Sequence, residues 1–115
     1  MSVYFDAFGQ KEEAIFYVDQ YRNNGRLFVG MYTLAEPMYW EPFDDVTVNL
    51  PHEQVTDKSC CGFINVNNFE QLPKILEENG LAEPTGKYGF SGWCSYPEYR
   101  FNMDALKEHM AAKIW

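Results

Sequence analysis

Two runs of β-branched and aromatic residues on either side of a short polar turn constrain the fold of this chain more than any other feature. The first run covers residues 14–21 (AIFYVDQY) and the second covers residues 27–34 (LFVGMYTL). Between them lie Asn23, Asn24 and Gly25, residue types that tolerate the positive φ angles of tight turns. The first run also has partly helical spacing, but its side chains favour a strand. We therefore predict an antiparallel hairpin.

Two shorter segments extend the predicted sheet. Residues 46–50 (VTVNL) alternate strictly, so we expect Val46, Val48 and Leu50 on the face that points into the core. Residues 61–66 (CGFINV) form an apolar run of the length of a short strand. Aromatic residues make up 17% of the chain, which agrees with a core dominated by sheet, because strands favour such side chains.

Start and stop signals predict two short helices. Pro73 suits a first helical turn and Gly80 suits the residue after a helix end, so we expect a helix over residues 73–79. Residues 100–101 are expected to close a short strand before a terminal helix. That helix is capped by Asn102, and its apolar stripe consists of Met103, Leu106, Met110 and Ile114. Both helices should pack on the sheet.

Two segments rich in proline and glycine are predicted to be loops. Residues 35–42 (AEPMYWEP) place aromatic residues between two prolines, and residues 82–99 contain prolines and glycines at short intervals. Aromatic side chains in such loops are typical anchors of protein interfaces, unless both loops fold down and bury their rings in the core. The candidates for partner binding are Tyr39, Trp40, Trp93, Tyr96 and Tyr99.

These elements predict a single α+β domain over residues 1–115, with a small, mainly antiparallel sheet of about five strands and two short helices packed on it. The length suits one hydrophobic core, and no repeat or linker divides the chain. Nine Lys and Arg against 17 Asp and Glu give a net charge of −8. This field repels phosphate backbones and anionic lipids, so we expect neither nucleic-acid nor membrane binding.

The cysteines and the termini indicate a cytoplasmic protein. Three cysteines cannot all pair within one chain, and Cys60 and Cys61 are adjacent, which disfavours a bridge between them. Free thiols in a reducing compartment are the simpler interpretation. No basic start precedes an apolar stretch, and no run approaches the length that spans a bilayer.

The side chains that bear reactive chemistry form no recognisable catalytic or metal-binding pattern. Cys94 lies near glycine, but no oxyanion-type glycine cluster surrounds it. Carboxylate pairs such as Asp44 and Asp45 are typical of solvated faces in an acidic protein. None of the soft ligands forms a zinc-type pair, so we predict no metal and no cofactor. These ligands are His52, Cys60, Cys61, Cys94 and His109.

Several pieces of the last two thirds of the chain resemble an uncharacterised bacterial domain-of-unknown-function family. They are residues 47–51 (TVNLP), 67–68 (NN), 78–86 (ENGLAEPTG), 91–92 (SG) and 96–101 (YPEYRF). Members of that family are short single-domain proteins of conjugative elements in anaerobic gram-positive gut bacteria. The resemblance implies a cytoplasmic accessory protein of a mobile genetic element, and it transfers no active site.

Three functions remain open at this point. The first is a non-enzymatic interaction with an unidentified protein partner through the aromatic loops, with a homodimer through the edge strand at residues 46–50 as a further expectation. The second is an acidic DNA mimic that inhibits a host restriction or defence protein. The third is a small-ligand binder or enzyme that uses residues 83–100. Its polar candidates are Cys94, Tyr96, Glu98 and Arg100.

Overall fold

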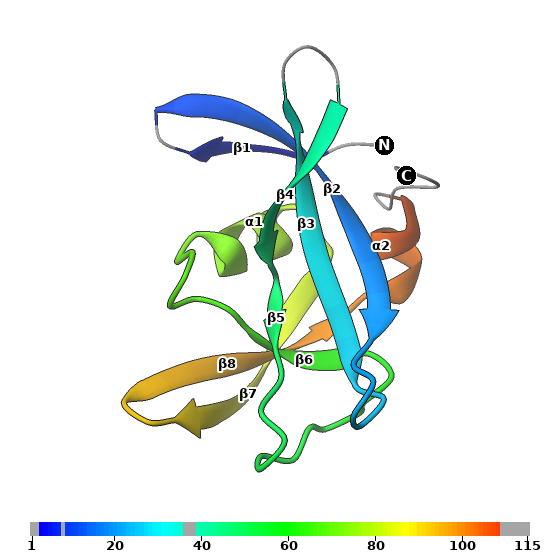
Figure 1. Ribbon diagram of the computed structural model, residues 1–115, viewed down its shortest axis with the longest axis vertical. Helices are drawn as coiled ribbons and strands as arrows, with labels where there is room; N and C mark the ends of the chain where they lie inside the picture. Colours follow the sequence, from blue (N-terminus) through cyan, green and yellow to red (C-terminus); the bar gives the residue numbers. More distant parts are fainter. Residues whose placement is uncertain (1–2, 8, 36–38, 109–115) are drawn as a thin grey trace.

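The computed structural model describes residues 3–7, 9–35 and 39–108. Within these ranges the chain forms eight strands and two helices around a shared core (Figure 1). In chain order the elements are β1 (Val3–Ala7), β2 (Gln10–Gln20), β3 (Leu27–Ala35), β4 (Tyr39–Asp45), β5 (Thr47–Val48), β6 (Cys61–Ile64), α1 (Leu72–Glu78), β7 (Ala82–Ser91), β8 (Cys94–Phe101) and α2 (Met103–Glu108).

The strands form two four-stranded sheets, and every described pair of strands is antiparallel. Sheet 1 has the order β1-β2-β3-β4, and sheet 2 has the order β5-β6-β8-β7. The predicted class, a mainly antiparallel α+β fold with two short helices, is confirmed. The strands number eight in two sheets among the described residues, where about five in one sheet were expected.

The predicted hairpin at residues 14–34 is confirmed as β2 and β3. Its strands pair from Ala14 opposite Thr33 to Gln20 opposite Leu27, and the turn contains Gly25 with a φ of 70°. A positive φ suits glycine because it has no Cβ to clash with the backbone. The inward side chains of this hairpin, such as Phe16, are fully buried. The hairpin therefore supplies a large share of the core.

Both helices pack on the core as predicted. Leu72 and Leu76 of α1 and Leu106 of α2 are fully buried. The N–H of Leu81 donates to the carbonyl of Leu76 at 2.9 Å, which ends α1 in the expected way. The side chain of Asn102 accepts the N–H of Ala105 at 3.1 Å, as a helix cap does. The further stripe residues Met110 and Ile114 lie outside the described residues.

The prediction of two aromatic loops is wrong. Tyr39 begins β4, and residues 82–99 form most of the β7–β8 hairpin, while residues 36–38 lie outside the described part. Pro42 and Pro84 are tolerated because β4 and β7 end their sheets and both strands are irregular. The β3–β4 register shifts next to Pro42, and the β7–β8 register shifts just after Pro84.

The predicted strand at residues 46–50 is also shorter than expected. Only Thr47 and Val48 form β5, and the strict alternation fails because Thr47 is buried while Val48 is half-buried. The hydroxyl of Thr47 accepts the N–H of Val29 at 3.1 Å, and the N–H of Val46 donates to the carbonyl of Val29 at 2.8 Å. This edge is thus short and is already hydrogen-bonded to β3, and the edge-strand dimer stays a prediction.

Candidate functional site

The structure does not bring the five predicted partner-binding residues together. Tyr39 and Trp40 lie at the start of β4, whereas the other three belong to the β7–β8 hairpin, whose turn lies near the opposite end of the molecule (Figure 1). Tyr39 and Trp93 are exposed, and Trp40 and Tyr96 are half-buried. Only the β7–β8 hairpin gathers several of the predicted residues on one element.

Tyr99 is a structural residue, because its side chain is only 5% exposed. Its hydroxyl donates to the Glu77 carboxylate at 2.6 Å and thereby connects β8 to α1. Burial and the neighbouring Glu77 charge raise the pKa of Tyr99. Sequence reasoning does not foresee this burial, since the contact with α1 joins residues that are far apart in the chain.

The turn of the β7–β8 hairpin displays large aromatic side chains. Ser91 pairs with Cys94, so Gly92 and Trp93 form a two-residue turn, and the φ of 60° at Gly92 suits such a turn. Trp93 is fully exposed, and Tyr88 and Phe90 are 54% and 56% exposed. We call Tyr88, Phe90 and Trp93 the aromatic tip.

Sequence reasoning missed Tyr88 and Phe90, although a signal for them exists. Aromatic residues two apart lie on the same face of a strand, and a glycine between strand-like runs marks a hairpin turn. The segment 88–96 (YGFSGWCSY) has both features. The glycines and prolines at short intervals instead favour a loop over residues 82–99, and this pattern hides the strand signal.

The opposite face of the hairpin packs against the core. A Cβ atom on Gly89 would lie 2.8 Å from Leu50 Cδ1 and from Phe63 Cε1, so only glycine fits here without movement. Tyr96 pairs with Gly89 and shares this half-buried face. The side chain of Asn67 donates to the carbonyl of Ser95 at 3.2 Å. These contacts fix the direction in which the aromatic tip points.

The connection between β5 and β6, which we call the 51–60 segment, covers the outer edge of β7. The carboxylate of Glu53 accepts the N–H of Phe90 at 2.8 Å, and the His52 ring donates to the carbonyl of Phe90. The ammonium group of Lys87 donates to the carbonyl of Gln54. Arg26 in turn donates to the carbonyl of Glu53 at 2.6 Å and anchors the segment to sheet 1.

Glu98 is fully buried at the point where β7 and β8 lose their register. Its carboxylate accepts the Thr56 N–H at 2.7 Å, the Thr56 hydroxyl at 2.6 Å and the Thr85 hydroxyl at 2.7 Å. Burial alone would raise the pKa of Glu98, but these hydrogen bonds and the charge of Lys87 outweigh it and hold the pKa below its usual range. Glu98 therefore stays ionised and ties the 51–60 segment to the hairpin.

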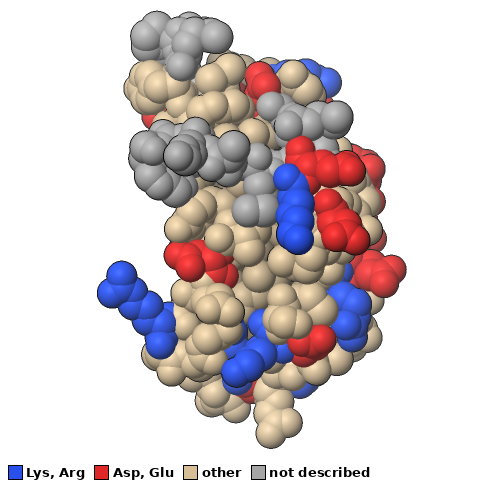
Figure 2. Space-filling model, turned by 90° about the vertical axis from the view of Figure 1, so that its right-hand side faces the viewer, with Lys and Arg blue, Asp and Glu red and all other residues tan. Residues whose placement is uncertain are grey.

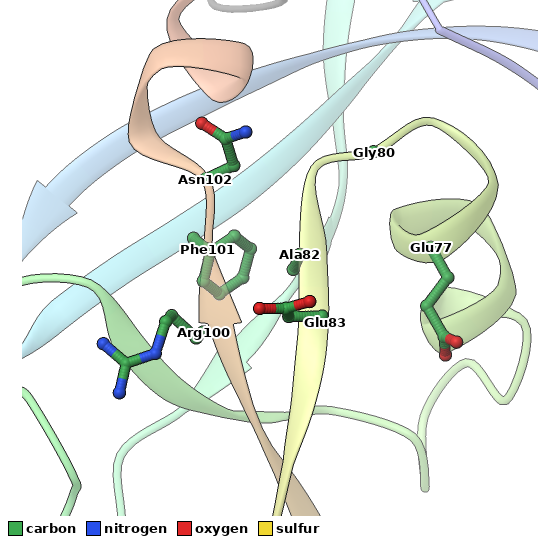
Figure 3. A pocket seen from close by; sticks show the side chains of 7 residues that line it. All are labelled: Glu77, Gly80, Ala82, Glu83, Arg100, Phe101 and Asn102. Carbon is green, nitrogen blue, oxygen red and sulfur yellow. The ribbon is translucent and has the colours of Figure 1, made fainter.

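A hollow of about 550 Å³ lies between the end of α1 and the start of β7 (Figure 3). Glu77 reaches it from the helix, while Glu83 and Arg100 come from paired strands, with the Arg100 side chain directed away from Glu77. Glu77 is already engaged by Tyr99, and Arg100 donates to the Cys60 sulfur at 3.5 Å. The hollow thus brings together no nucleophile and base.

The residues proposed for a ligand site within 83–100 are dispersed as well. Glu98 is enclosed in its hydrogen bonds, Arg100 lies beside Cys60, and Cys94 lies half-buried next to the turn. Cys61 is buried, which raises the pKa of its thiol to about 11 and favours the protonated form.

Among residues 3–7, 9–35 and 39–108, no group of three His, Cys, Asp or Glu side chains is placed to hold a metal ion. No helix in the same part of the chain combines the length and the apolar character that crossing a membrane requires. His109 lies outside the described residues.

The charged residues mix on the face that Figure 2 shows. Asp and Glu lie mostly over its upper half and Lys and Arg mostly over its lower half, with both signs present in each half. A mimic of a phosphate backbone would present carboxylates in a row with few cations among them. This face does not have that pattern.

Comparison with known proteins gives a family for the chain. The family DUF4313, described as a domain of unknown function, matches residues 15–114. The match includes β3 to β8 and both helices, and therefore the aromatic tip and the 51–60 segment. No curated protein and no solved structure matches the chain.

Proposed function

We propose that this chain, which belongs to the DUF4313 family, is a non-enzymatic protein-interaction protein that engages its partner through the aromatic tip. The observation that carries the proposal is the full exposure of Trp93 on a two-residue turn, with Phe90 and Tyr88 exposed beside it. Exposed tryptophan and tyrosine side chains are the residues that most often dominate binding energy when a partner covers them.

The energetics of the aromatic tip support this role. Transfer of one large apolar side chain from water into a partner's pocket contributes about 1.5–3 kcal/mol. A flexible loop would lose much of this gain in conformational entropy on binding. Gly89 against the core and the 51–60 segment along β7 hold the hairpin in place before binding. The partner expected for such a tip is a protein with an apolar pocket.

The separation of the reactive side chains supports a role without catalysis. Catalysis by a nucleophile needs a base within hydrogen-bond reach of it, and a ligand pocket needs polar groups that converge. Cys94, Glu98 and Arg100 instead have separate surroundings, as described above. We therefore propose that the chain is not an enzyme.

We also propose that the chain acts in the cytoplasm as an accessory protein of a mobile genetic element. The support for this part is the resemblance of residues 47–101 to proteins of conjugative elements. Recovery of the same partner from cells that carry the element and from cells cured of it would place the partner in the host. Recovery only from cells that carry the element would place the partner on the element.

The test of the interaction is affinity capture with the full chain and three variants. We expect a defined partner to be lost with the double variant Trp93→Ala and Phe90→Ala, and to be retained with Tyr4→Ala. Tyr4 is a matched control because it is 58% exposed and lies on β1, away from the tip. Binding must then be reproduced with the purified partner. Unchanged recovery by a folded double variant would refute the proposal, and loss only with Tyr39→Ala would move the interface to β4.

A further inference from the structure

A second surface lies on sheet 1, where a hollow of about 450 Å³ opens over Gly30. Its lining comes from three neighbouring strands, β2, β3 and β4. The side chains that matter for its chemistry are Tyr17, Phe28, Tyr32, Pro42, Asp44 and Asp45. We call this hollow the Gly30 groove. It shares no residue with the aromatic tip.

The groove exists because β3 has no side chain at its centre. Gly30 pairs with Tyr17 on β2 and with Asp45 on β4, so these three residues lie in one row across the sheet. The ring of Phe28 lies against Gly30, since a Cβ on Gly30 would lie 3.2 Å from two atoms of that ring. Tyr17 and Phe28 meet edge to face with ring centroids 6.2 Å apart. The groove therefore has an aromatic floor and wall.

Carboxylates line the β4 side of the groove. Asp44 accepts the N–H of Asp45 at 2.8 Å, and the side chain of Asn65 donates to it at 3.4 Å. Within the described residues, the Asp45 carboxylate has neither a hydrogen-bond donor nor a cation as partner. Partial burial and the charge of Asp44 raise the pKa of Asp45, which means that its ionised form is destabilised. A cation bound beside it would stabilise that form.

Sheet 1 as a whole carries a net negative charge. The strands β1 to β4 contain one cation, Lys11, and seven carboxylates, which gives 1 − 7 = −6. These carboxylates are Asp6, Glu12, Glu13, Asp19, Glu41, Asp44 and Asp45. A surface of this kind attracts basic partners over a range of roughly a Debye length, about 8–10 Å at physiological salt.

We propose that the Gly30 groove binds a lysine or arginine side chain presented by a basic peptide segment of a partner protein. Aromatic faces attract cations through their ring electrons, and a carboxylate beside them supplies the complementary charge. The aromatic floor selects against a strongly hydrated metal ion, which needs several oxygen ligands, and the negative rim selects against an acidic peptide. The charge complementarity of the groove thus specifies its occupant.

The binding test uses short synthetic peptides and NMR titration of the full chain. We expect an oligolysine peptide to shift the resonances of Gly30, Phe28 and Tyr32, and an oligoglutamate peptide to leave them unchanged. A peptide of trimethylated lysine should bind as well, because contact with an aromatic face needs no N–H donor. A peptide of norleucine, which keeps the aliphatic chain without the charge, should not bind.

Two pairs of variants separate the groove from general electrostatics. Asp45→Asn and Asp104→Asn remove the same charge, but Asp104 lies on α2 outside the groove. Phe28→Leu and Tyr4→Leu remove one aromatic ring each, but Tyr4 is exposed on β1 outside the groove. We expect the first member of each pair to weaken oligolysine binding by roughly two- to fivefold, and the second to have little effect.

The outcomes that overturn the groove proposal differ from those that overturn the aromatic tip. Equal weakening by Asp45→Asn and Asp104→Asn would show attraction by net charge alone. Shifts produced by Mg²⁺ alone, or by raising the protein concentration without peptide, would assign the groove to a metal ion or to a second copy. Each result would refute the peptide proposal and leave the role of Trp93 untouched.

Discussion

Glu98 shows how one buried residue can set the shape of a distant surface. Its carboxylate bonds Thr56 in the 51–60 segment and Thr85 in β7, where the strands β7 and β8 are out of register. A buried carboxylate is stable only when its oxygens accept hydrogen bonds or pair with cations. The sequence around it, Tyr96-Pro97-Glu98-Tyr99, gives no sign of burial, because its partners lie elsewhere in the chain.

The first prediction concerns the replacement Glu98→Gln. The amide removes the charge and replaces one accepting carboxylate oxygen with an NH₂ group, which weakens the hydrogen bonds from Thr56 and Thr85, so we expect a loss of about 1.5–3 kcal/mol in the free energy of unfolding. Urea unfolding measures this loss. Glu83→Gln, at an exposed position of the same hairpin, should change stability by no more than about 0.5 kcal/mol. Equal effects of the two replacements would contradict the structural role of Glu98.

The second prediction concerns acid. The pKa of Glu98 lies below its usual value of 4.5 in the folded chain, so folding favours the ionised form. The resulting stability is fully present above the pKa of the unfolded state and is lost as the pH falls through the folded value. We therefore expect the free energy of unfolding of the native chain to fall more steeply than that of Glu98→Gln between about pH 5 and about pH 2. Parallel curves would refute this assignment.

At the scale of elements, turn and cap residues predicted those elements whose boundaries depend only on neighbouring residues. The β2–β3 hairpin and α1 were found because Asn23-Asn24-Gly25, Pro73 and Gly80 act within a few residues of themselves. The β7–β8 hairpin was missed because Pro84 is accommodated by the edge position of β7 and by a register shift, which depend on the rest of sheet 2. Strand pairing between distant segments is the part of a fold that a local pattern does not specify.

In the candidate site, too, some residues depend on local sequence and others on distant contacts. Trp93 was selected as an aromatic residue of a predicted loop, and the structure places it fully exposed in a turn. The burial of Tyr99 was not foreseen because it depends on α1, and Tyr88 was missed with the hairpin that presents it. Exposure is thus predictable for a turn residue, but for a strand residue it depends on which neighbours cover each face.

The third prediction concerns the packing of the hairpin. Gly89→Ala would place a methyl group 2.8 Å from atoms of Leu50 and Phe63, which must then shift. Overpacking of this kind costs about 1–3 kcal/mol. Thermal or urea unfolding should show this loss, whereas Ser95→Ala, at an exposed position of the same hairpin, should have little effect. Unchanged stability of Gly89→Ala would mean that the hairpin does not pack on Leu50 and Phe63 as described.

At the scale of the whole molecule, the proposed surfaces differ in chemistry and in place. The Gly30 groove belongs to the acidic sheet 1, and the aromatic tip belongs to the outer hairpin of sheet 2. The chain is elongated, with principal extents of 41 × 28 × 23 Å. The two proposed sites therefore predict that one partner binds by its basic segment while another binds by its apolar pocket.

The fourth prediction follows from this arrangement. Weakening of the groove by Asp45→Asn and weakening of the tip by Trp93→Ala should act independently, since the two sites share no residue. Affinity for each partner, measured by calorimetry with the single and double variants, should respond only to the variant in its own site. Weakening of both partners by either single variant would indicate one continuous interface instead of two.

The most direct measurement of the central claim is site-specific photo-crosslinking in living cells. A photoreactive amino acid at position 93 should give a discrete adduct with one protein, and the replacement Phe90→Ala in the same chain should reduce its yield. The same probe at position 104, an exposed site on α2, should not give this adduct. Absence of any adduct at position 93, or identical products at both positions, would contradict a partner-binding role for the aromatic tip.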